Sequence, residues 1–461
     1  MEATIDDVRA ELACGANANA QGSGGDTPIL VAMRNNRDPA ILDLPLDHGA
    51  NIQAGAPGGD TPLHLAARLA ENPAVVQVLL DHGAIVDAKN DDGETPLHVA
   101  IPKNENPAIA LALIESGANL ELPTDDGEPL LYVAVVITVI RDGDTTVVQA
   151  LLDKGADTEA NNQDGNTPLH FAASWDRSSR VVNARLDHGA NIEAKTDDGS
   201  TPLHLAALLN TNQAIIEALL GRGAIIETKN ERGETPLHGA ALGNRNPEVV
   251  QTLLDNGAEI DAKTDNGSTS LHRAAGSNNN PAIVQTLLDN GADVEAKNDE
   301  GLTPLHLATA LNSQSAVTQT LLDHGADIES KADRGETPLH MAAFNENPAI
   351  IQALLDNGAN IHAKGGGGVT PLHLLAARNT DSAVIHTLLD HGADIEAKTD
   401  GGETPLHFAA IFTQNPAVIQ TLLDRGADID AQTNGGKTAL DLAIESDNSD
   451  AIQILREHGA D

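Results

Sequence analysis

Residues 233–257 read GETPLHGAALGNRNPEVVQTLLDNG, a stretch that contains the start and stop signals of two short helices. Thr235 can cap the first helix, and the proline after it fits the first helical position, where a missing N–H costs nothing. Asn246, again followed by proline, starts the second helix in the same way. Gly257 then supplies the left-handed residue that ends it. The stretch therefore predicts a helix-turn-helix unit.

Copies of this unit follow one another along the chain. The residues equivalent to Thr235 stand at 27, 61, 95, 129, 167, 201, 235, 269, 303, 337, 370, 404 and 438, and we call the thirteen units repeats 1 to 13. Ten of the twelve spacings are 34 residues, and the other two are 38 and 33. Neither helix has an apolar face wide enough to stand alone. Each unit must therefore stack on its neighbours.

The repeated motifs point to a known family. Thr-Pro-Leu-His followed by Ala-Ala, then a Leu-Leu pair, Gly-Ala-Asp and an Asp-x-x-Gly-x-Thr turn, resembles the ankyrin repeat and does so in register from Thr27 onward. The resemblance implies an all-α ankyrin-repeat solenoid of stacked helix-turn-helix layers with β-hairpin-like finger turns. The family's usual period is 33 residues. The extra residue here falls in the bend between the helices, for example from Leu242 to Asn246, and only lengthens a loop.

The repeat pattern predicts three parts. Residues 1–26 match the second half of a unit, from Asp6 to Leu12, and read as an N-terminal half-repeat cap. Residues 27–437 hold twelve ankyrin repeats. Residues 438–461 lack the proline and histidine of the motif, which resembles the closing repeat of ankyrin arrays.

Composition restricts the partners and the location. The chain has 68 acidic and 27 basic residues, a formal charge of −41. Nucleic acid and anionic membrane surfaces would be repelled, and a basic protein surface is the natural complement. The alternative is that the acid serves solubility. The single cysteine, Cys14, agrees with a reducing compartment, and no secretory signal or membrane-spanning run is visible. We expect a cytoplasmic monomer; some bacteria deliver such arrays into host cells, so that destination stays open.

The histidines follow two columns, which favours structure over metal or acid–base chemistry. At the fourth place of Thr-Pro-Leu-His, an imidazole can bond back to the capping residue, as Glu or Gln does in a capping box. The histidines of this column are His64, His98, His170, His204, His238, His272, His306, His340, His373 and His407. A second column precedes the stop glycine, where a positive or dipolar group suits the helix end. Its members are His48, His82, His188, His324, His391 and His458.

The charged residues after the second helix are also columnar. Acids such as Glu227 and Glu295 recur there, with lysines such as Lys229 and Lys297 two residues later. We expect the two columns to neutralise each other between neighbouring turns, each exposed pair contributing about 0–1 kcal/mol. Calcium needs several oxygens that converge on one point. Acid pairs in the turns, one layer apart, should diverge, so we expect no metal and no cofactor; these pairs are Asp91-Asp92, Asp125-Asp126 and Asp197-Asp198.

No catalytic motif is present. The sequence contains no nucleophile elbow, phosphate-binding loop, HExxH or paired cysteines. A stack of similar layers also forms a groove and not a closed pocket. The pattern therefore predicts a protein that is not an enzyme.

Repeats 4 and 5 break the pattern most. Tyr132 replaces the histidine in repeat 4, four extra residues follow Val136, and Arg185 of repeat 5 stands where a buried leucine is expected. A buried unpaired charge is costly, so we expect Arg185 to bend towards solvent or to meet an acid. We predict that residues 129–187 are the least stable segment. Pro45 inside a helix of repeat 1 should also cost about 3 kcal/mol unless that helix bends.

Candidate binding residues lie where the repeats differ. In ankyrin proteins the end of the first helix and the finger turns line the concave binding face, so the resemblance implies a role for these positions. At the helix ends they are Trp175, Asp176, Arg177, Phe344, Asn345, Glu346, Ile411 and Phe412. In the turns they are Asp91, Asp92, Asp197, Asp198, Glu231, Arg232, Asp299, Glu300, Asp333 and Arg334. Trp175, the only tryptophan, is the leading anchor; Phe344 and Phe412 could instead fill gaps between layers.

The sequence thus favours a protein-binding scaffold that holds an extended partner on a preformed, acidic concave surface. An alternative is an acidic mimic or sequestering protein that binds basic proteins mainly by charge. A third is an effector whose enzymatic domain lies on another chain. Salt separates the first two, because charge-led binding weakens strongly between low and moderate salt.

Overall fold

The computed structural model describes residues 10, 12, 14–22, 25–35, 39–124, 126–345, 347–378 and 382–460. Within these residues the chain forms helices and turns, and no strand. Its contacts divide it into two compact units, one of Met1–Ala206 with Asn212–Ile225 and one of Ala207–Thr211 with Ile226–Asp461. Half of the expected N-terminal cap, and Asp125, lie outside the described residues. The division into cap, twelve repeats and closing repeat stays a prediction.

Each described repeat contributes a first and a second helix. The first helices are α2 Pro28–Asn35, α4 Pro62–Leu69, α6 Pro96–Lys103, α8 Leu130–Ile140, α10 Pro168–Trp175, α12 Pro202–Leu209, α14 Pro236–Gly243, α16 Ser270–Ser277, α18 Pro304–Leu311, α20 Pro338–Met341 with the 3₁₀ turn η1 Ala342–Phe344, α22 Pro371–Arg378, α24 Pro405–Phe412 and α26 Ala439–Glu445. The second helices are α3 Ala40–Asp47, α5 Ala74–Asp81, α7 Pro107–Glu115, α9 Thr146–Asp153, α11 Arg180–Asp187, α13 Gln213–Gly221, α15 Pro247–Asp255, α17 Pro281–Asp289, α19 Ser315–Asp323, α21 Pro348–Asp356, α23 Ser382–Asp390, α25 Pro416–Asp424 and α27 Ser449–Glu457.

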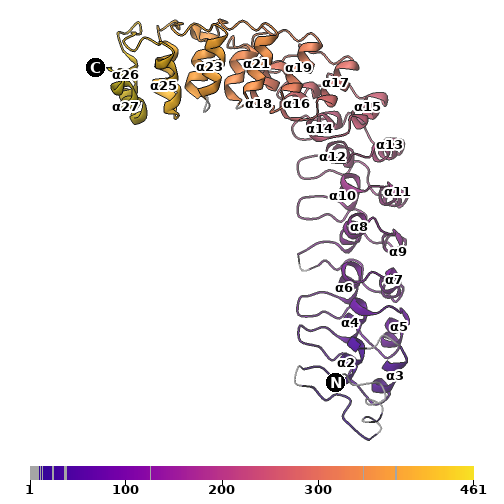
Figure 1. Ribbon diagram of the computed structural model, residues 1–461. Coiled ribbons are helices and arrows are strands. Elements are labelled where there is room, and N and C mark those ends of the chain that lie inside the picture. The colour runs from indigo at the N-terminus through magenta and orange to yellow at the C-terminus, as the bar shows by residue number, and fades with distance from the viewer. Residues whose placement is uncertain are drawn as a thin grey trace. The chain divides into compact units, whose positions relative to one another are not determined.

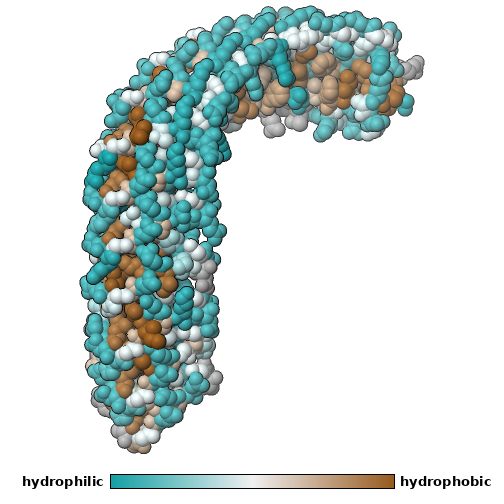
Figure 2. Space-filling view, turned by 180° about the vertical axis from the view of Figure 1, so that it is seen from behind, coloured by the Kyte–Doolittle hydropathy of each residue, from teal (hydrophilic) through white to brown (hydrophobic). Residues whose placement is uncertain are grey.

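Within each unit, first helices pack on first helices and second helices on second helices. Figure 1 shows the two rows, for example α4, α6, α8 and α10 beside α5, α7, α9 and α11. The core is a ribbon of small and branched aliphatic side chains, such as Leu237, Ala240 and Val249, which are at most 1% exposed. Figure 2 shows the result on one face, where hydrophobic patches recur among hydrophilic stripes along each unit. The expected all-α stack is confirmed.

The finger turns project beside the first helices (Figure 1). A turn closes with backbone hydrogen bonds such as Asn298 N–H to the Leu302 carbonyl at 3.1 Å and Gly301 N–H to the Asn298 carbonyl at 3.0 Å, and it forms no strand among the described residues. The Asp299 N–H also donates to a backbone carbonyl oxygen of the preceding turn at 3.2 Å. Gly301 has φ +72°, and a Cβ there would lie 2.2 Å from the Asp333 carboxylate of the next turn. This close approach explains the glycine of the Asp-x-x-Gly-x-Thr motif.

The histidine column confirms the predicted capping box and adds a bond between repeats. In repeat 7, the Nδ1 atom of His238 accepts the backbone N–H of Thr235 at 3.2 Å, so the ring proton is on Nε2. Nε2 lies 3.3 Å from the carbonyl oxygen of Ser268, in the turn before the next repeat, and donates to it. Equivalent bonds to the following turn are made by His64, His170, His272, His306, His340, His373 and His407. His98 instead contacts the carbonyl oxygen of Leu122, earlier in the segment before the irregular repeat 4.

Burial keeps these histidines neutral. It lowers the pKa of His170, His238 and His306 from 6.5 to about 4. A backbone carbonyl at Nε2 opposes the decrease, but the cost of burying a charged imidazole is larger. The neutral form is therefore part of the folded structure.

Asparagines make a second connection between repeats that the sequence analysis did not predict. Asn278 follows helix α16, is 6% exposed, and donates its amide to the carbonyl oxygens of Ala241 at 3.0 Å and Asn244 at 2.9 Å in the preceding repeat. The extra residue of the 34-residue period lies in the bend that this amide fixes. The same two-carbonyl pattern is made by Asn104, Asn244, Asn312 and Asn448.

The charged columns bond to backbone groups, so the expected mutual neutralisation is not the arrangement found. The Glu227 carboxylate accepts the N–H of Glu259 in the next repeat at 2.8 Å. The Lys229 ammonium donates to the carbonyl oxygen of Lys263 at 2.8 Å. Neighbouring turns present these N–H and C=O groups at fixed positions, which makes them competitive partners for both charges. The two columns therefore connect successive turns.

The length differences between repeats change the first helix. The four extra residues of repeat 4 extend α8 to 11 residues, whereas most other first helices have 8. The one-residue deletion in repeat 10 tightens the end of that helix into η1. Tyr132, which replaces the histidine, makes no capping box, and its hydroxyl accepts a bond from the Asn162 amide at 3.1 Å. Pro45 lies inside α3, which continues through it.

The expectation for Arg185 was wrong. Its side chain neither reaches solvent nor pairs with an acid, but is fully buried and donates Nη2 to the Thr158 carbonyl. Among the described residues, Nε and Nη1 have no hydrogen-bond partner. Burial lowers the pKa of the guanidinium to about 10, and Glu159 and Asp157 oppose this only at a distance. Helix α11 holds the side chain in the column that leucine fills in the neighbouring repeats, which leaves it no path to water.

We predict that acid destabilises the stack through the histidine column. Between pH 6.5 and about 4 the unfolded chain binds protons that the folded histidines do not, so the free energy of unfolding decreases as the pH falls. From pH 7 to pH 5 the loss is on the order of 2 kcal/mol per strongly shifted histidine. Urea unfolding followed by circular dichroism measures it. His238→Gln, which keeps a capping acceptor, should show a shallower pH dependence; an unchanged slope would contradict the explanation.

We also predict that residues 129–187 exchange amide hydrogens before residues 201–360, because one poor repeat weakens its interfaces with both neighbours. Arg185→Leu should slow exchange in this segment and raise the free energy of unfolding by about 1–3 kcal/mol, the cost of unsatisfied buried polar groups. Hydrogen exchange with mass spectrometry measures both effects. Equal protection of the two segments would show that the irregular repeats are not weak.

Candidate functional site

Five of the predicted binding residues meet in one groove of the second unit. The finger turns before repeats 9 and 10 face the first helices of repeats 10 and 11 across a space of about 590 Å³, which we call the Phe344 groove. Its lining residues are Asp299, Glu300, Leu302, Ala332, Asp333, Arg334, Glu336, Met341, Phe344, Leu374 and Arg378. The predicted members are Asp299, Glu300, Asp333, Arg334 and Phe344.

An exposed aromatic ring forms the centre of this groove. Phe344 is 48% exposed at the end of η1, and the guanidinium carbon of Arg378 lies 4.7 Å from its ring centroid. Such a cation–π contact holds the ring in place and contributes about 0.5–1 kcal/mol at an exposed site. About half of the ring is exposed to solvent, and its other contacts include Arg378 of the next repeat. The ring is a preformed apolar contact surface.

Acids outnumber bases around that ring. Four carboxylates line the groove with two guanidiniums, and one of these, Arg378, is engaged with Phe344. The turns are fixed by the hydrogen bond from Asp333 N–H to the Glu300 carbonyl at 3.2 Å. The groove therefore combines an apolar floor with a rigid, negatively charged rim.

The first unit has a more acidic groove, the Glu128 groove, of about 840 Å³. Five carboxylates from three successive finger turns line it, with no lysine or arginine among the lining residues, which include Asp92, Glu94, Asp126, Glu128 and Asp164. Burial raises the pKa of Glu128, and the neighbouring Asp126 and Asp164 carboxylates raise it further. Burial also acts to raise the pKa of Glu94, but hydrogen bonds from Lys103 and Asn90 lower it overall. Asp92 is the predicted residue in this groove.

The remaining predicted positions at helix ends have different roles. Trp175 is the last residue of α10 and is 52% exposed, as a surface anchor requires. Asp176 is buried, and its carboxylate accepts the N–H groups of Val181 and Val182 at the start of α11, so it is structural. Asn345 is partly buried and donates to a carbonyl of the preceding repeat. Glu346 lies outside the described residues.

The other predicted residues are at least partly accessible and do not line the Phe344 groove or the Glu128 groove. Phe412 is 58% exposed and packs edge-on against Phe408 at 5.9 Å between ring centroids, while Ile411 is half-buried. Arg177 is exposed. The exposed turn residues of this group are Asp91, Asp197, Asp198, Glu231 and Arg232.

Sequence reasoning missed several residues that line the grooves, among them Arg378 and Glu128. Arg378 occupies the same column as Trp175, at the end of the first helix, and this variable column was a usable signal. Glu128 stands directly before the motif, in a column that also holds Glu94, Glu234, Glu336 and Glu403, and the sequence prediction did not select this column. Only the stacking of three turns brings its carboxylate close to those of its neighbours.

Among the described residues, no group of three or more His, Cys, Asp or Glu side chains is arranged to hold a metal ion. Among the described helices, none combines the length and the apolar character needed to cross a membrane.

A model of the family described as "Ankyrin repeats (3 copies)" matches the chain repeatedly, at residues 3–90, 29–124, 135–230, 209–298, 271–365 and 372–461. Together these overlapping matches cover most of the sequence. None of the curated proteins compared with the chain matches it.

We predict that Trp175 behaves as a surface residue. Its fluorescence should be typical of an indole in contact with water and should be readily quenched by acrylamide, because half of the side chain is exposed. Trp175→Ala should change the free energy of unfolding by no more than about 0.5 kcal/mol, as at other exposed positions. A quencher-resistant emission, or a large loss of stability, would show instead that the ring packs between repeats.

Proposed function

Because the chain belongs to the ankyrin-repeat family, whose members are generally protein–protein interaction modules, we propose that it is a non-catalytic scaffold for a protein partner with a basic surface. The partner contacts the finger turns and the ends of the first helices. We further propose that the partner is extended and contacts several repeats along the concave face that the ankyrin repeat implies.

The Phe344 groove is the observation that carries this proposal. It holds an exposed aromatic ring in a fixed position beneath a rim of carboxylates. Aromatic and arginine residues are enriched among the residues that contribute most of the binding energy at interfaces. They contribute it when a partner covers them and excludes water. An apolar side chain flanked by lysine or arginine would match this floor and rim.

A second candidate is an acidic protein that sequesters basic proteins mainly by charge. The Glu128 groove supports it, because its lining contains five carboxylates without a lysine or arginine. Burial raises the pKa of Glu128 most, and repulsion between its carboxylate and those of Asp126 and Asp164 raises it further. A bound ammonium or guanidinium group would relieve this repulsion.

We also propose that the protein is a monomer in the cytoplasm. Cys14 is exposed and is not in a disulfide, in agreement with a reducing compartment. Delivery into a host cell is equally compatible with these properties.

The test compares proteins captured from a cell lysate by the wild-type chain and by Phe344→Ala, at low and moderate salt. Loss of a true anchor costs about 2 kcal/mol or more, or about thirty-fold in affinity. We expect a specific protein that the wild type retains at moderate salt and that Phe344→Ala loses. Affinities are then measured with the purified partner by calorimetry.

Ile225→Ala is the matched control, because Ile225 is an apolar side chain that is 57% exposed and lies outside the Phe344 groove. It should bind as the wild type does. If every captured protein is released at moderate salt and Phe344→Ala captures the same set, the charge-led alternative replaces the scaffold.

A further inference from the structure

The pattern of asparagine bonds between repeats is interrupted at repeat 4, as it is at Ala70 of repeat 2 and Asp176 of repeat 5. In repeats 3, 7, 8 and 9, an asparagine after the first helix donates to two carbonyl oxygens of the preceding repeat, as Asn104 does to Ala67 at 2.9 Å and to Ala70 at 3.0 Å. In repeat 4 the equivalent position is Thr138. The extra residues keep Thr138 inside α8, which runs on to Ile140. No amide is therefore available to continue the pattern.

Two backbone acceptors are left over as a result. By position they are the carbonyl oxygens of Ile101 and Asn104, at the end of helix α6. The backbone of Asn104 has φ −107° and ψ 130°, close to φ −87° and ψ 121° at Asn278. The carbonyl group of Asn104 therefore has the same orientation as that of Asn278, which accepts an asparagine amide. In the described part of the chain, no hydrogen bond to either oxygen from repeat 4 is present.

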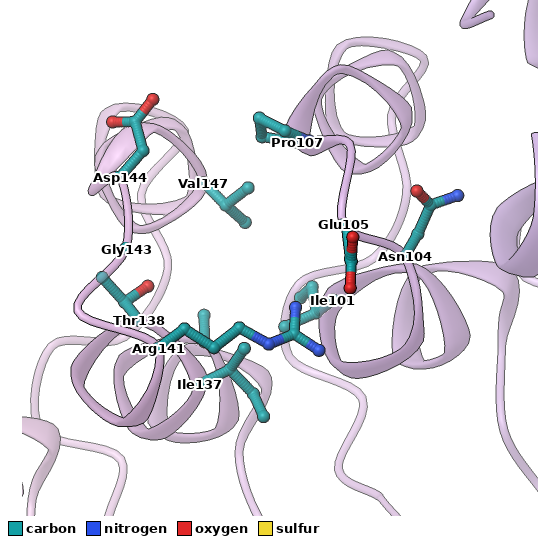
Figure 3. Close-up of a pocket in the computed structure, with 11 residues that line it drawn as sticks. Ile101, Asn104, Glu105, Pro107, Ile137, Thr138, Arg141, Gly143, Asp144 and Val147 are labelled. Atoms are coloured by element: carbon teal, nitrogen blue, oxygen red, sulfur yellow. The ribbon is translucent and has the colours of Figure 1, made fainter. Parts of the chain in front are cut away.

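A cavity of about 130 Å³ lies beside Thr138, the residue that stands in place of the asparagine (Figure 3). Both acceptor residues line it, and the side chains of Ala134, Ile137 and Val147 add apolar wall. An engineered apolar cavity of similar size binds benzene. Space for a small ring and two unused acceptors thus coincide.

Arg141 supplies a donor to the same cavity. Figure 3 shows its side chain crossing from helix α8 towards Glu105 and the opposite bend. Nη2 donates to the Pro102 carbonyl oxygen at 2.7 Å, which leaves the other N–H groups of the guanidinium for a ligand. The cavity therefore offers acceptors and a donor together.

We propose that this cavity binds a primary carboxamide attached to a small apolar or aromatic body. The amide N–H groups donate to the carbonyl oxygens of Ile101 and Asn104, as asparagine does in the regular repeats. The amide oxygen accepts from Arg141, which distinguishes a carboxamide from an ammonium or amidine ligand. A carboxylate is disfavoured because it cannot donate to the two carbonyl oxygens, and because Glu105 and Asp144 also line the site. The amide can come from a free molecule or from an Asn or Gln side chain of a bound protein.

The test titrates the full chain, with isotope-labelled isoleucine and valine methyl groups, with benzamide and follows the methyl signals by NMR. Signals of Ile101, Ile137 and Val147 should shift, while that of Ile283 in repeat 8 should not. N,N-dimethylbenzamide, which has no N–H, should bind about tenfold or more weakly, since two hydrogen bonds are lost. Benzoate should bind as weakly. Equal affinity for all three, or no shift, would overturn the proposal.

Val147→Phe is designed to fill the cavity from its partly exposed edge, and it should abolish the shifts. Arg141→Gln should weaken benzamide binding while the chain keeps its helical circular dichroism. Shifts that persist in folded Val147→Phe would place the ligand elsewhere and overturn the assignment.

A second pair of probes identifies the source of the amide: a short peptide with a central glutamine, and the same peptide with glutamate. Binding of the glutamine peptide alone supports a protein side chain. Binding of benzamide without either peptide supports a free ligand.

Discussion

The neutral histidine between successive repeats is the interaction on which the stack depends. His238 caps its own helix through Nδ1 and reaches the carbonyl of Ser268 in the next turn through Nε2. One buried ring thus satisfies a helix N-terminus and joins two repeats. Because burial keeps its pKa well below the ordinary value, the connection holds only for the uncharged ring. The asparagine and lysine columns add further bonds between neighbouring repeats.

Because these bonds join only neighbours, an irregular repeat has local consequences. Repeat 4 has a longer α8 and no asparagine at this position, and a cavity lies beside it, while repeats 7 to 9 make the regular asparagine bonds. Arg185 is similarly confined to repeat 5, where α11 buries its guanidinium against Thr158. In a compact globule such changes would disturb a shared core. In a linear stack such changes affect only the repeat in which they occur and its neighbours, so they can form a binding site.

Candidate binding surfaces form where stacking leaves residues free to vary. The end of the first helix carries Trp175, Phe344, Arg378 or Phe412 without effect on the buried columns. The finger turns beside it carry acids, and their backbones are fixed to one another by hydrogen bonds. A rigid scaffold with variable side chains on one side suits recognition of proteins, since little conformational entropy is lost on binding.

The sequence by itself determined the repeat, its helices, the capping boxes and the exposed columns, because these depend on local signals that recur in register. It also indicated Phe344 and the acids around it, through their place in variable positions. Only the tertiary structure showed that Asp176 is buried, that Arg185 reaches no water, and that Glu128 lies among other carboxylates. Each of these depends on contacts with side chains or backbone from other elements. Neither the asparagine bonds nor the cavity beside Ile137 could be predicted from the sequence, because their partners lie in adjacent repeats whose spacing depends on the stacked geometry.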